Sequence, residues 1–382
     1  NGRRRSGVKA LAPLVALLTA GVVFASRCAS NGPQDTLKPA GPRARTIHHL
    51  IVPVFGIAGV VFVLILGGAL WIAVKFRAKD DDDFNEFPEQ VHGNFRLEIG
   101  WTILPAVVLA VVAIFTVLTI FDLAKKPADA VTVEVTGQQW WWEYRYDLDS
   151  DGTPDIITAQ QMVIPAGRQI DLKIKSNDVI HSFWIPMLNG KKDAMPGRTH
   201  DWSLEADKPG IYEGQCTEFC GLSHGYMRME VKALPPAEYE DWVQSQQAPP
   251  AEPAGELAKE GRTAFLAQCA YCHQVNGLTS EGEYSDEGPV NDYKGLDGAA
   301  LPTVRPGVAP NLTHLMSRNR FAGNMFPLYY EDGTPDEGKL KEWLANPQAM
   351  KPMMPDNLQG MPNLNLDPAT IDALVAYLIT LD

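Results

Sequence analysis

Two long apolar runs constrain the fold of this chain more than any other feature of its sequence. Residues Val52 to Val74 and Ile103 to Phe121 each supply the roughly 20 apolar residues that a helix needs to cross a lipid bilayer. Trp71 and Trp101 lie near the ends of these runs, where tryptophan anchors a helix at the membrane surface. We therefore expect a transmembrane helical hairpin within residues 45–125.

Basic residues predict the orientation of this hairpin. Four of them lie between the two runs: Lys75, Arg77, Lys79 and Arg96. The positive-inside rule places such a segment in the cytoplasm, and Arg43 and Arg45 on the opposite flank oppose this only slightly. We expect a multi-pass protein of a bacterial cytoplasmic membrane, with the residues after Phe121 on the outer, periplasmic side.

The first residues are typical of a targeting segment. An apolar stretch at 10–26 follows a basic start, as in a secretory signal peptide. Residues 1–28 are therefore predicted to be a signal peptide or a retained N-terminal anchor. Cys28 is placed for lipid attachment, but Arg27 stands where lipoprotein signals carry a small residue, so both interpretations of Cys28 stay open.

Length and charge limit the architecture and the partners. A chain of 382 residues suggests two or three domains. Its formal net charge of -13 argues against nucleic acid as a partner. The same acidity favours a basic partner, such as a small cationic electron carrier.

A loop in the middle of the chain gathers two cysteines, a histidine and a methionine. Thiolate, thioether and imidazole groups suit copper, and a weak methionine ligand is typical of electron-transfer copper centres. Two cysteines can bridge a pair of copper ions if a second imidazole arrives from elsewhere. The predicted ligands are His181, Cys216, the backbone carbonyl of Glu218, Cys220, His224 and Met227.

Two other interpretations of this loop remain open on the residues alone. Cys216 and Cys220 would form a disulfide in an oxidising compartment, but that leaves the neighbouring histidine and methionine unexplained. Two cysteines and two histidines would bind zinc, but zinc sites do not recruit methionine. Copper is the favoured interpretation.

The loop resembles the CuA loop of subunit II of haem-copper cytochrome c oxidases, and the likeness extends through residues 192–198 and 209–215. The resemblance implies that the ligands named above hold a dinuclear CuA centre. It also implies that the Glu218 side chain binds a Mg or Mn ion shared with the catalytic subunit. A carboxylate is a suitable hard ligand for such an ion, and Asp193 is expected to be hydrogen-bonded nearby.

Short alternating runs from Val131 to Lys232, broken by glycine and proline, predict strands. We expect an all-β sandwich with Greek-key connections, of the cupredoxin kind, over residues 130–233. Trp140, Trp141 and Trp142 are consecutive, which puts at least one ring on each face of a strand and predicts one exposed face.

By the same resemblance, Trp140 is the residue at which electrons enter. The alternative is that the three rings cover the membrane-facing side of the sandwich. Residues 97–105 are similar to the subunit II pattern of Glu, Trp-Thr and Pro, in which the acid lies at a proton channel of the neighbouring subunit. That makes Glu98 a proton-entry candidate, and the alternative is a solvated carboxylate at a helix end.

A polar, proline-rich spacer at residues 244–254 predicts a linker. Beyond it, Cys269, Cys272 and His273 form the CxxCH pattern of covalent c-type haem attachment. Two thiols add to the haem vinyl groups, and the adjacent histidine binds the iron. We therefore expect an all-α cytochrome c domain of class I over residues 255–382.

The opposite axial ligand of the haem is expected to be a methionine, which raises the haem potential relative to a second histidine. The candidates are Met350, Met353, Met354 and Met361. Met361 is chosen because it precedes the predicted C-terminal helix, Pro368 to Leu381, at the interval seen in class I cytochromes c. Met354 is the second choice.

The whole combination resembles subunit II of a caa3-type cytochrome c oxidase. It implies an electron-entry subunit that receives electrons from a cytochrome c or an upstream quinol-oxidising complex. Haem c and CuA would pass them to the haem-copper subunit I, which reduces oxygen to water with proton pumping, and subunit III would be a further partner. The catalytic centre would then lie outside this chain.

Three other functions are alternatives to this one. A CuA-containing nitric oxide reductase would use the same electron-transfer domains. A membrane-anchored electron shuttle would need neither two helices nor the acid at Glu98. Nitrous oxide reduction would require a large additional catalytic domain.

Overall fold

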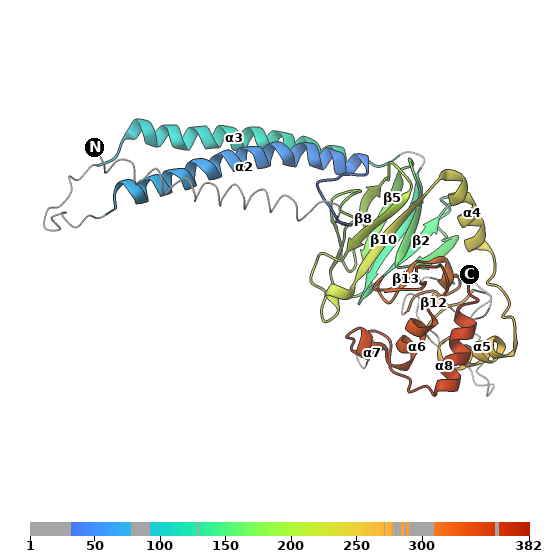
Figure 1. The fold of residues 1–382 in the computed structure, drawn as a ribbon. Coiled ribbons are helices and arrows are strands. Elements are labelled where there is room, and N and C mark those ends of the chain that lie inside the picture. The colour runs from blue at the N-terminus through green and yellow to red at the C-terminus, as the bar shows by residue number, and fades with distance from the viewer. Residues whose placement is uncertain are drawn as a thin grey trace. The chain divides into compact units, whose positions relative to one another are not determined.

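Among the described residues, two helices are long and apolar enough to cross a membrane. They are α2 (Pro42–Lys75) and α3 (Phe95–Leu123), the two long coils in Figure 1. Their apolar side chains are exposed, as in Leu64 and Phe121 at 67% and 70%. Such a continuous apolar surface is stable in lipid rather than in water. Asn94 caps α3 by accepting hydrogen bonds from the amides of Arg96 and Leu97, each at 3.2 Å.

The structure is a computed structural model that describes residues 32–77, 92–127, 130–270, 272–276, 278, 284–285, 288–289, 309–355 and 359–382. The predicted signal peptide or anchor with Cys28, and also Lys79, lie outside the described residues. The chain divides into two compact units. One is Arg45–Lys125, and the other joins the residues up to Ala44 with Lys126–Asp382.

The β domain consists of two main sheets and a small strand pair. The first sheet has the order β3 (Ile156–Ala159), β2 (Trp141–Asp147), β1 (Val131–Gln138), β5 (Ile170–Ser176), β8 (His200–Leu204). The second has the order β4 (Gln161–Pro165), β10 (Arg228–Leu234), β9 (Gly210–Gln215), and β6 (His181–Phe183) pairs with β7 (Lys192–Ala194). The chain leaves the first sheet after β3, forms β4 in the second, and returns in β5. This crossing makes a sandwich of the predicted Greek-key type.

Alternation within the strands builds the core of the sandwich. Val131, Val133 and Val135 on β1 are buried, whereas Thr132 and Glu134 between them are only partly buried. The three valines form one apolar cluster with Ile164 and Val231 of the second sheet. Burying each such side chain contributes about 1.5–3 kcal/mol. The sandwich is therefore a rigid support for the loops at its end.

A helix connects the β domain with the C-terminal domain. α4 (Pro236–Gln247) packs Trp242 against Tyr146 of β2, with ring centroids 5.3 Å apart. The helix ends inside the residues predicted to form the linker, because Tyr239, Trp242 and Val243 give it a buried face. Residues 248–255 then lead to the next helix without regular structure.

The C-terminal domain is mainly helical. Its helices are α5 (Glu256–Gln268), α6 (Glu337–Ala345), α7 (Pro347–Met350) and α8 (Pro368–Leu378). Two-residue strand pairs, β11 (Tyr284–Ser285) with β12 (Gly288–Pro289) and β13 (Arg320–Phe321) with β14 (Phe326–Pro327), add to the predicted all-α fold. Short 3₁₀ turns are η1 (His224–Tyr226), in the β domain, and η2 (Leu315–Ser317).

The contact between α5 and α8 forms the centre of this domain. Phe265 and Tyr377 pack with ring centroids 5.4 Å apart. Gly261 lies so close to α8 that a Cβ there would stand 1.9 Å from the Ala373 carbonyl oxygen. α8 starts at the Asp367 cap and ends at Leu378, three residues before the predicted end.

Candidate metal centres

The predicted copper ligands come from the end of the β sandwich. His181 begins β6, and the other ligands lie on the loop from β9 to β10. The two strands pair with Gln215 opposite Arg228, which brings the two ends of the loop together. The amide of Cys216 donates to the carbonyl of Met227 at 2.9 Å and closes the loop. The pairing of β9 with β10 therefore fixes the positions of predicted ligands that lie on a loop.

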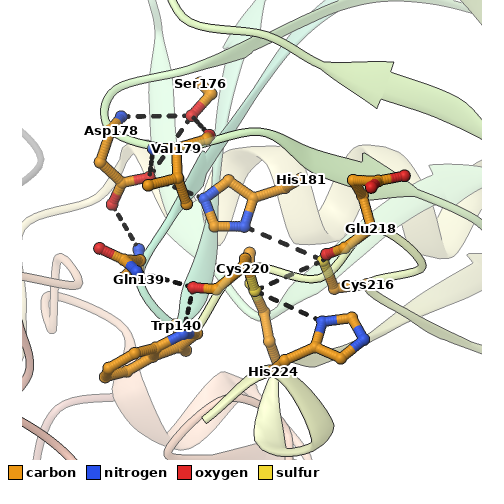
Figure 2. A network of polar contacts seen from close by, with 11 residues as sticks. Gln139, Trp140, Ser176, Asp178, Val179, His181, Cys216, Glu218, Cys220 and His224 are labelled. Carbon is orange, nitrogen blue, oxygen red and sulfur yellow. Dashed lines mark hydrogen bonds and ion pairs between the residues drawn. The ribbon is translucent and has the colours of Figure 1, made fainter. Parts of the chain in front are cut away.

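The structure brings all six predicted donors together, and Figure 2 shows five of them. The Sγ atom of Cys216 lies 3.9 Å from Nδ1 of His181 and 3.3 Å from the carbonyl oxygen of Glu218. The Sγ atom of Cys220 lies 3.5 Å from Nδ1 of His224 and 3.8 Å from Sδ of Met227. Two cysteine thiols, two imidazoles, a methionine thioether and a backbone carbonyl in one cluster match the donor set of a copper pair.

The two cysteines are free thiols in this structure. Their Sγ atoms are 3.8 Å apart, whereas a disulfide bond is about 2.0 Å long. The disulfide interpretation of the loop is therefore wrong for this structure. The ligand atoms of His181, Cys216 and Cys220 lie within 4.8 Å of one another, which is compact enough for a metal ion.

The thiols of Cys216 and Cys220 differ in acidity. The hydrogen bond from Cys220 lowers the pKa of Cys216, and the same bond raises the pKa of Cys220. Without metal, the pair therefore holds one proton, with the negative charge on Cys216. Metal binding needs both thiolates and releases that proton.

Asp178 orients His181, and the sequence analysis missed it. Its Oδ1 atom lies 2.7 Å from Nε2 of the His181 ring (Figure 2). Its Oδ2 atom accepts a hydrogen bond from the amide of Gln139 at 2.6 Å. Burial lowers the pKa of His181, but the hydrogen bonds to Asp178 and Cys216 raise it by more in total. A carboxylate three residues before a predicted histidine ligand was the available signal.

Trp140 is buried, with 2% exposure, and contacts the copper loop directly. Its indole Nε1 donates to the carbonyl of Cys220 at 2.9 Å, and the Gln139 side chain donates to the same oxygen at 2.7 Å (Figure 2). The expectation of an exposed aromatic face is wrong, because Trp141 and Trp142 are only 7% and 0% exposed. Trp140 and Trp141 line a cavity together with residues of the C-terminal domain, and Trp142 packs against His181 and Phe183 of the β domain.

A cavity of about 540 Å³ brings the CxxCH residues and the tryptophans together. It is lined by Cys269, Cys272, His273, Met353 and Met361 from the C-terminal domain and by Trp140 and Trp141 from the β domain. Most of the other lining side chains are apolar, including Leu374 and Leu378 of α8. A large apolar cavity with two thiols and an imidazole fits a covalently attached haem.

His273 is prepared to bind a metal through its second ring nitrogen. Its Nδ1 atom lies 2.9 Å from the carbonyl of Pro310, and donation to that oxygen leaves Nε2 with a free lone pair. Burial lowers the pKa of His273, so the ring is neutral at pH 7. Burial also raises the pKa of Cys269 to about 12, which keeps this thiol protonated. Pro310 could not be predicted from the sequence, because it contributes a backbone carbonyl, which every residue has.

Of the two preferred axial methionines, only Met361 lines the cavity. It packs against the apolar core of the C-terminal domain. Met354 is 39% exposed and pairs with Gln359 in an isolated bridge. Met353 also lines the cavity, but it packs against the core of the β domain. The position of Met361 favours it as the axial ligand.

Glu98 and Glu218 are both exposed, as their predicted roles require. Glu98 is exposed in the first turn of α3. Glu218 is exposed too, so its carbonyl faces Cys216 while its side chain remains free for another ligand. Asp193 accepts a hydrogen bond from Ser182 at 2.9 Å, next in sequence to the predicted copper ligand His181.

Three family models match the chain in order along its length. The model of the cytochrome c oxidase subunit II transmembrane domain matches residues 32–119, that of its periplasmic domain 147–234, and that of cytochrome c 258–382. These matches confirm the predicted fold classes and a membrane anchor with periplasmic domains.

Individual proteins give the same result. The chain is 32% identical over 366 residues to cytochrome c oxidase subunit 2 of Alkalihalophilus pseudofirmus, covering 94% of each. It is 32% identical over 364 residues to that of Bacillus sp. strain PS3, covering 91% of each. It is also similar to a solved structure, the periplasmic domain of subunit II of cytochrome oxidase of Bradyrhizobium japonicum. There the identity is 29%, the TM-score is 0.30, and the match covers 32% of this chain and 97% of that one.

Proposed function

Since this chain belongs to the cytochrome c oxidase subunit II family and carries a cytochrome c domain, we propose that it is the electron-entry subunit of an aerobic terminal oxidase. Its donor is a cytochrome c or an upstream quinol-oxidising complex. Its acceptor is the haem-copper subunit I, which reduces oxygen to water and pumps protons, with subunit III in the same assembly.

The cluster at the end of the β sandwich binds the copper pair. The ligands are His181, Cys216, the carbonyl of Glu218, Cys220, His224 and Met227. Haem c is attached to Cys269 and Cys272, with His273 and Met361 as axial ligands. When bound, the copper pair and the haem each take up and release single electrons.

The contacts of Trp140 carry the proposal. This residue lines the cavity that holds the CxxCH residues, and its indole donates to the carbonyl of Cys220. One side chain thus contacts both candidate centres, which supports Trp140 as the entry residue for electrons.

Two further roles belong to the same proposal. Glu98 is the proton-entry residue at the start of α3. The exposed carboxylate of Glu218 binds a Mg or Mn ion shared with subunit I. A hard carboxylate ligand and a soft sulfur cluster on one loop suit two different metals.

Purification of the intact protein from membranes in mild detergent tests this function. We expect about two copper ions and one haem c per chain, from the ligand count of the two sites. We also expect a large subunit with a-type haem to co-purify. Isolation of the chain alone, or zinc in place of copper, would contradict the proposal. Oxygen consumption without nitric oxide consumption would separate it from a nitric oxide reductase.

A further inference from the structure

Two buried ionisable side chains connect the β domain and the C-terminal domain. Glu230 on β10 is 2% exposed, and Lys351 after α7 is 4% exposed. Burying an ionised group without compensating partners is costly, so such groups are rare unless they are hydrogen-bonded. Each of these two finds partners in the other domain.

Glu230 receives amide donors from the C-terminal domain. Asn319 donates to its carboxylate at 2.8 Å and Asn324 at 3.3 Å. Within its own domain, Gln161 also donates to this carboxylate. The carboxylate of one domain is thus enclosed by side chains from both.

Lys351 belongs to the C-terminal domain and contacts the β domain. Its Nζ atom donates to the carbonyl of Trp140 at 2.7 Å and to the carbonyl of Ala322, in its own domain, at 3.3 Å. Among the described residues, no carboxylate forms an ion pair with it. The lysine therefore contacts the β domain at the backbone of the proposed entry residue.

The backbones also meet between these two side chains. The amide of Arg228 donates to the carbonyl of Gly323 at 3.0 Å. A Cβ at Gly323 would stand 2.4 Å from the carbonyl of Tyr226 and 3.1 Å from that of Trp140. Only a glycine permits this approach, and its φ of +81° is also one that glycine adopts readily.

We infer that Glu230 and Lys351 are positioning residues that hold the cytochrome c domain in one orientation, with its haem cavity closed against Trp140. This inference rests on the proposed electron-entry function. A tether alone would give an effective concentration of about millimolar and many orientations. The buried polar contacts select one of them, so that electrons reach Trp140 through this domain and not from a diffusing carrier.

Single substitutions in the intact complex test the inference. Lys351→Met keeps an unbranched side chain, one atom shorter, and leaves the Trp140 carbonyl without this donor. Glu230→Gln removes the buried charge. An unsatisfied buried group shifts an equilibrium by about tenfold to a hundredfold. We expect hydrogen exchange to accelerate at residues 140–142 and 320–327, and transfer from haem c to copper to slow. Copper and haem content should not change.

Matched controls separate this effect from general damage. Lys339→Met and Glu134→Gln remove partly exposed charges, one from each domain, that form ion pairs within that domain, and both should behave as the unaltered protein. Lys351→Arg keeps a cationic donor and should restore part of the slow exchange.

A second pair of variants keeps the test decisive if Lys351→Met does not fold. Asn319→Asp places a second carboxylate against Glu230 and should open the contact. Asn319→Asp combined with Glu230→Gln removes the repulsion and should close it again. Exchange and electron transfer at the unaltered rates in all loaded variants would overturn the inference. Absence of haem-to-copper transfer in the unaltered complex would instead overturn the proposed function, while the exchange data would still report on the contact.

Discussion

At the scale of residues, two of the predicted histidine ligands each depend on a neighbour that is not a ligand. Asp178 fixes the His181 ring, and the carbonyl of Pro310 fixes His273. Such partners set which ring nitrogen is free for the metal. The CxxCH and copper-loop residues were predictable because their chemistry depends on local spacing. Their partners were harder to predict, because a hydrogen bond depends on where the folded backbone places each atom.

Asp178→Asn should weaken copper binding. The amide keeps one acceptor but loses the charge that supports the His181 ring, and loss of such a partner reduces metal affinity by about tenfold to a hundredfold. Competition with a copper chelator measures the change. Asp149→Asn, an exposed aspartate in the same domain, is the control and should leave the affinity unchanged. Equal affinities for the two variants would show that Asp178 has no such role.

At the scale of elements, the close packing of α5 on α8 sets the geometry of the haem cavity. Gly261→Ala would place a methyl group 1.9 Å from the Ala373 carbonyl if nothing moved. We expect the helices to separate at a cost of about 1–3 kcal/mol, seen as a lower unfolding temperature of the haem domain. Gly338→Ala in α6 meets no atom closer than 3.4 Å and should be neutral or stabilising by up to about 1 kcal/mol. Equal stability of the two variants would mean that α8 can shift to accommodate the added methyl group at little cost.

The N-terminal cap of α8 should make part of the domain stability depend on pH. Hydrogen bonds from the side chain and amide of Thr370 lower the pKa of Asp367 below its ordinary value of 3.8. The unfolded chain therefore binds the proton more tightly than the folded chain. The contribution of this carboxylate is complete above pH 3.8 and is lost as the pH falls through the folded pKa. Asp367→Asn keeps a capping oxygen without titrating, so unfolding measured from pH 6 to pH 2 should depend less on pH, to about the extent that one carboxylate explains. Identical pH profiles would exclude this role.

At the scale of the whole molecule, the proposed order of centres predicts a simple response to copper removal. In protein depleted of copper by a chelator, an external donor should still reduce haem c, because the haem precedes copper in the route. Oxygen should then fail to reoxidise that haem. Absorption of the haem before and after donor and oxygen are added measures both steps. Loss of haem reduction, or normal reoxidation, would contradict the order.

The membrane helices, the β and cytochrome c domains and the donor groups of both candidate metal sites could be predicted from the sequence alone. Apolar length, strand alternation and the spacing of cysteine, histidine and methionine are local properties, so they can be read along the chain. The burial of Trp140, and the hydrogen bond to its carbonyl from Lys351, 211 positions away, could be learned only from the folded chain. Contacts between distant segments follow from how whole domains pack, and no local pattern encodes that packing.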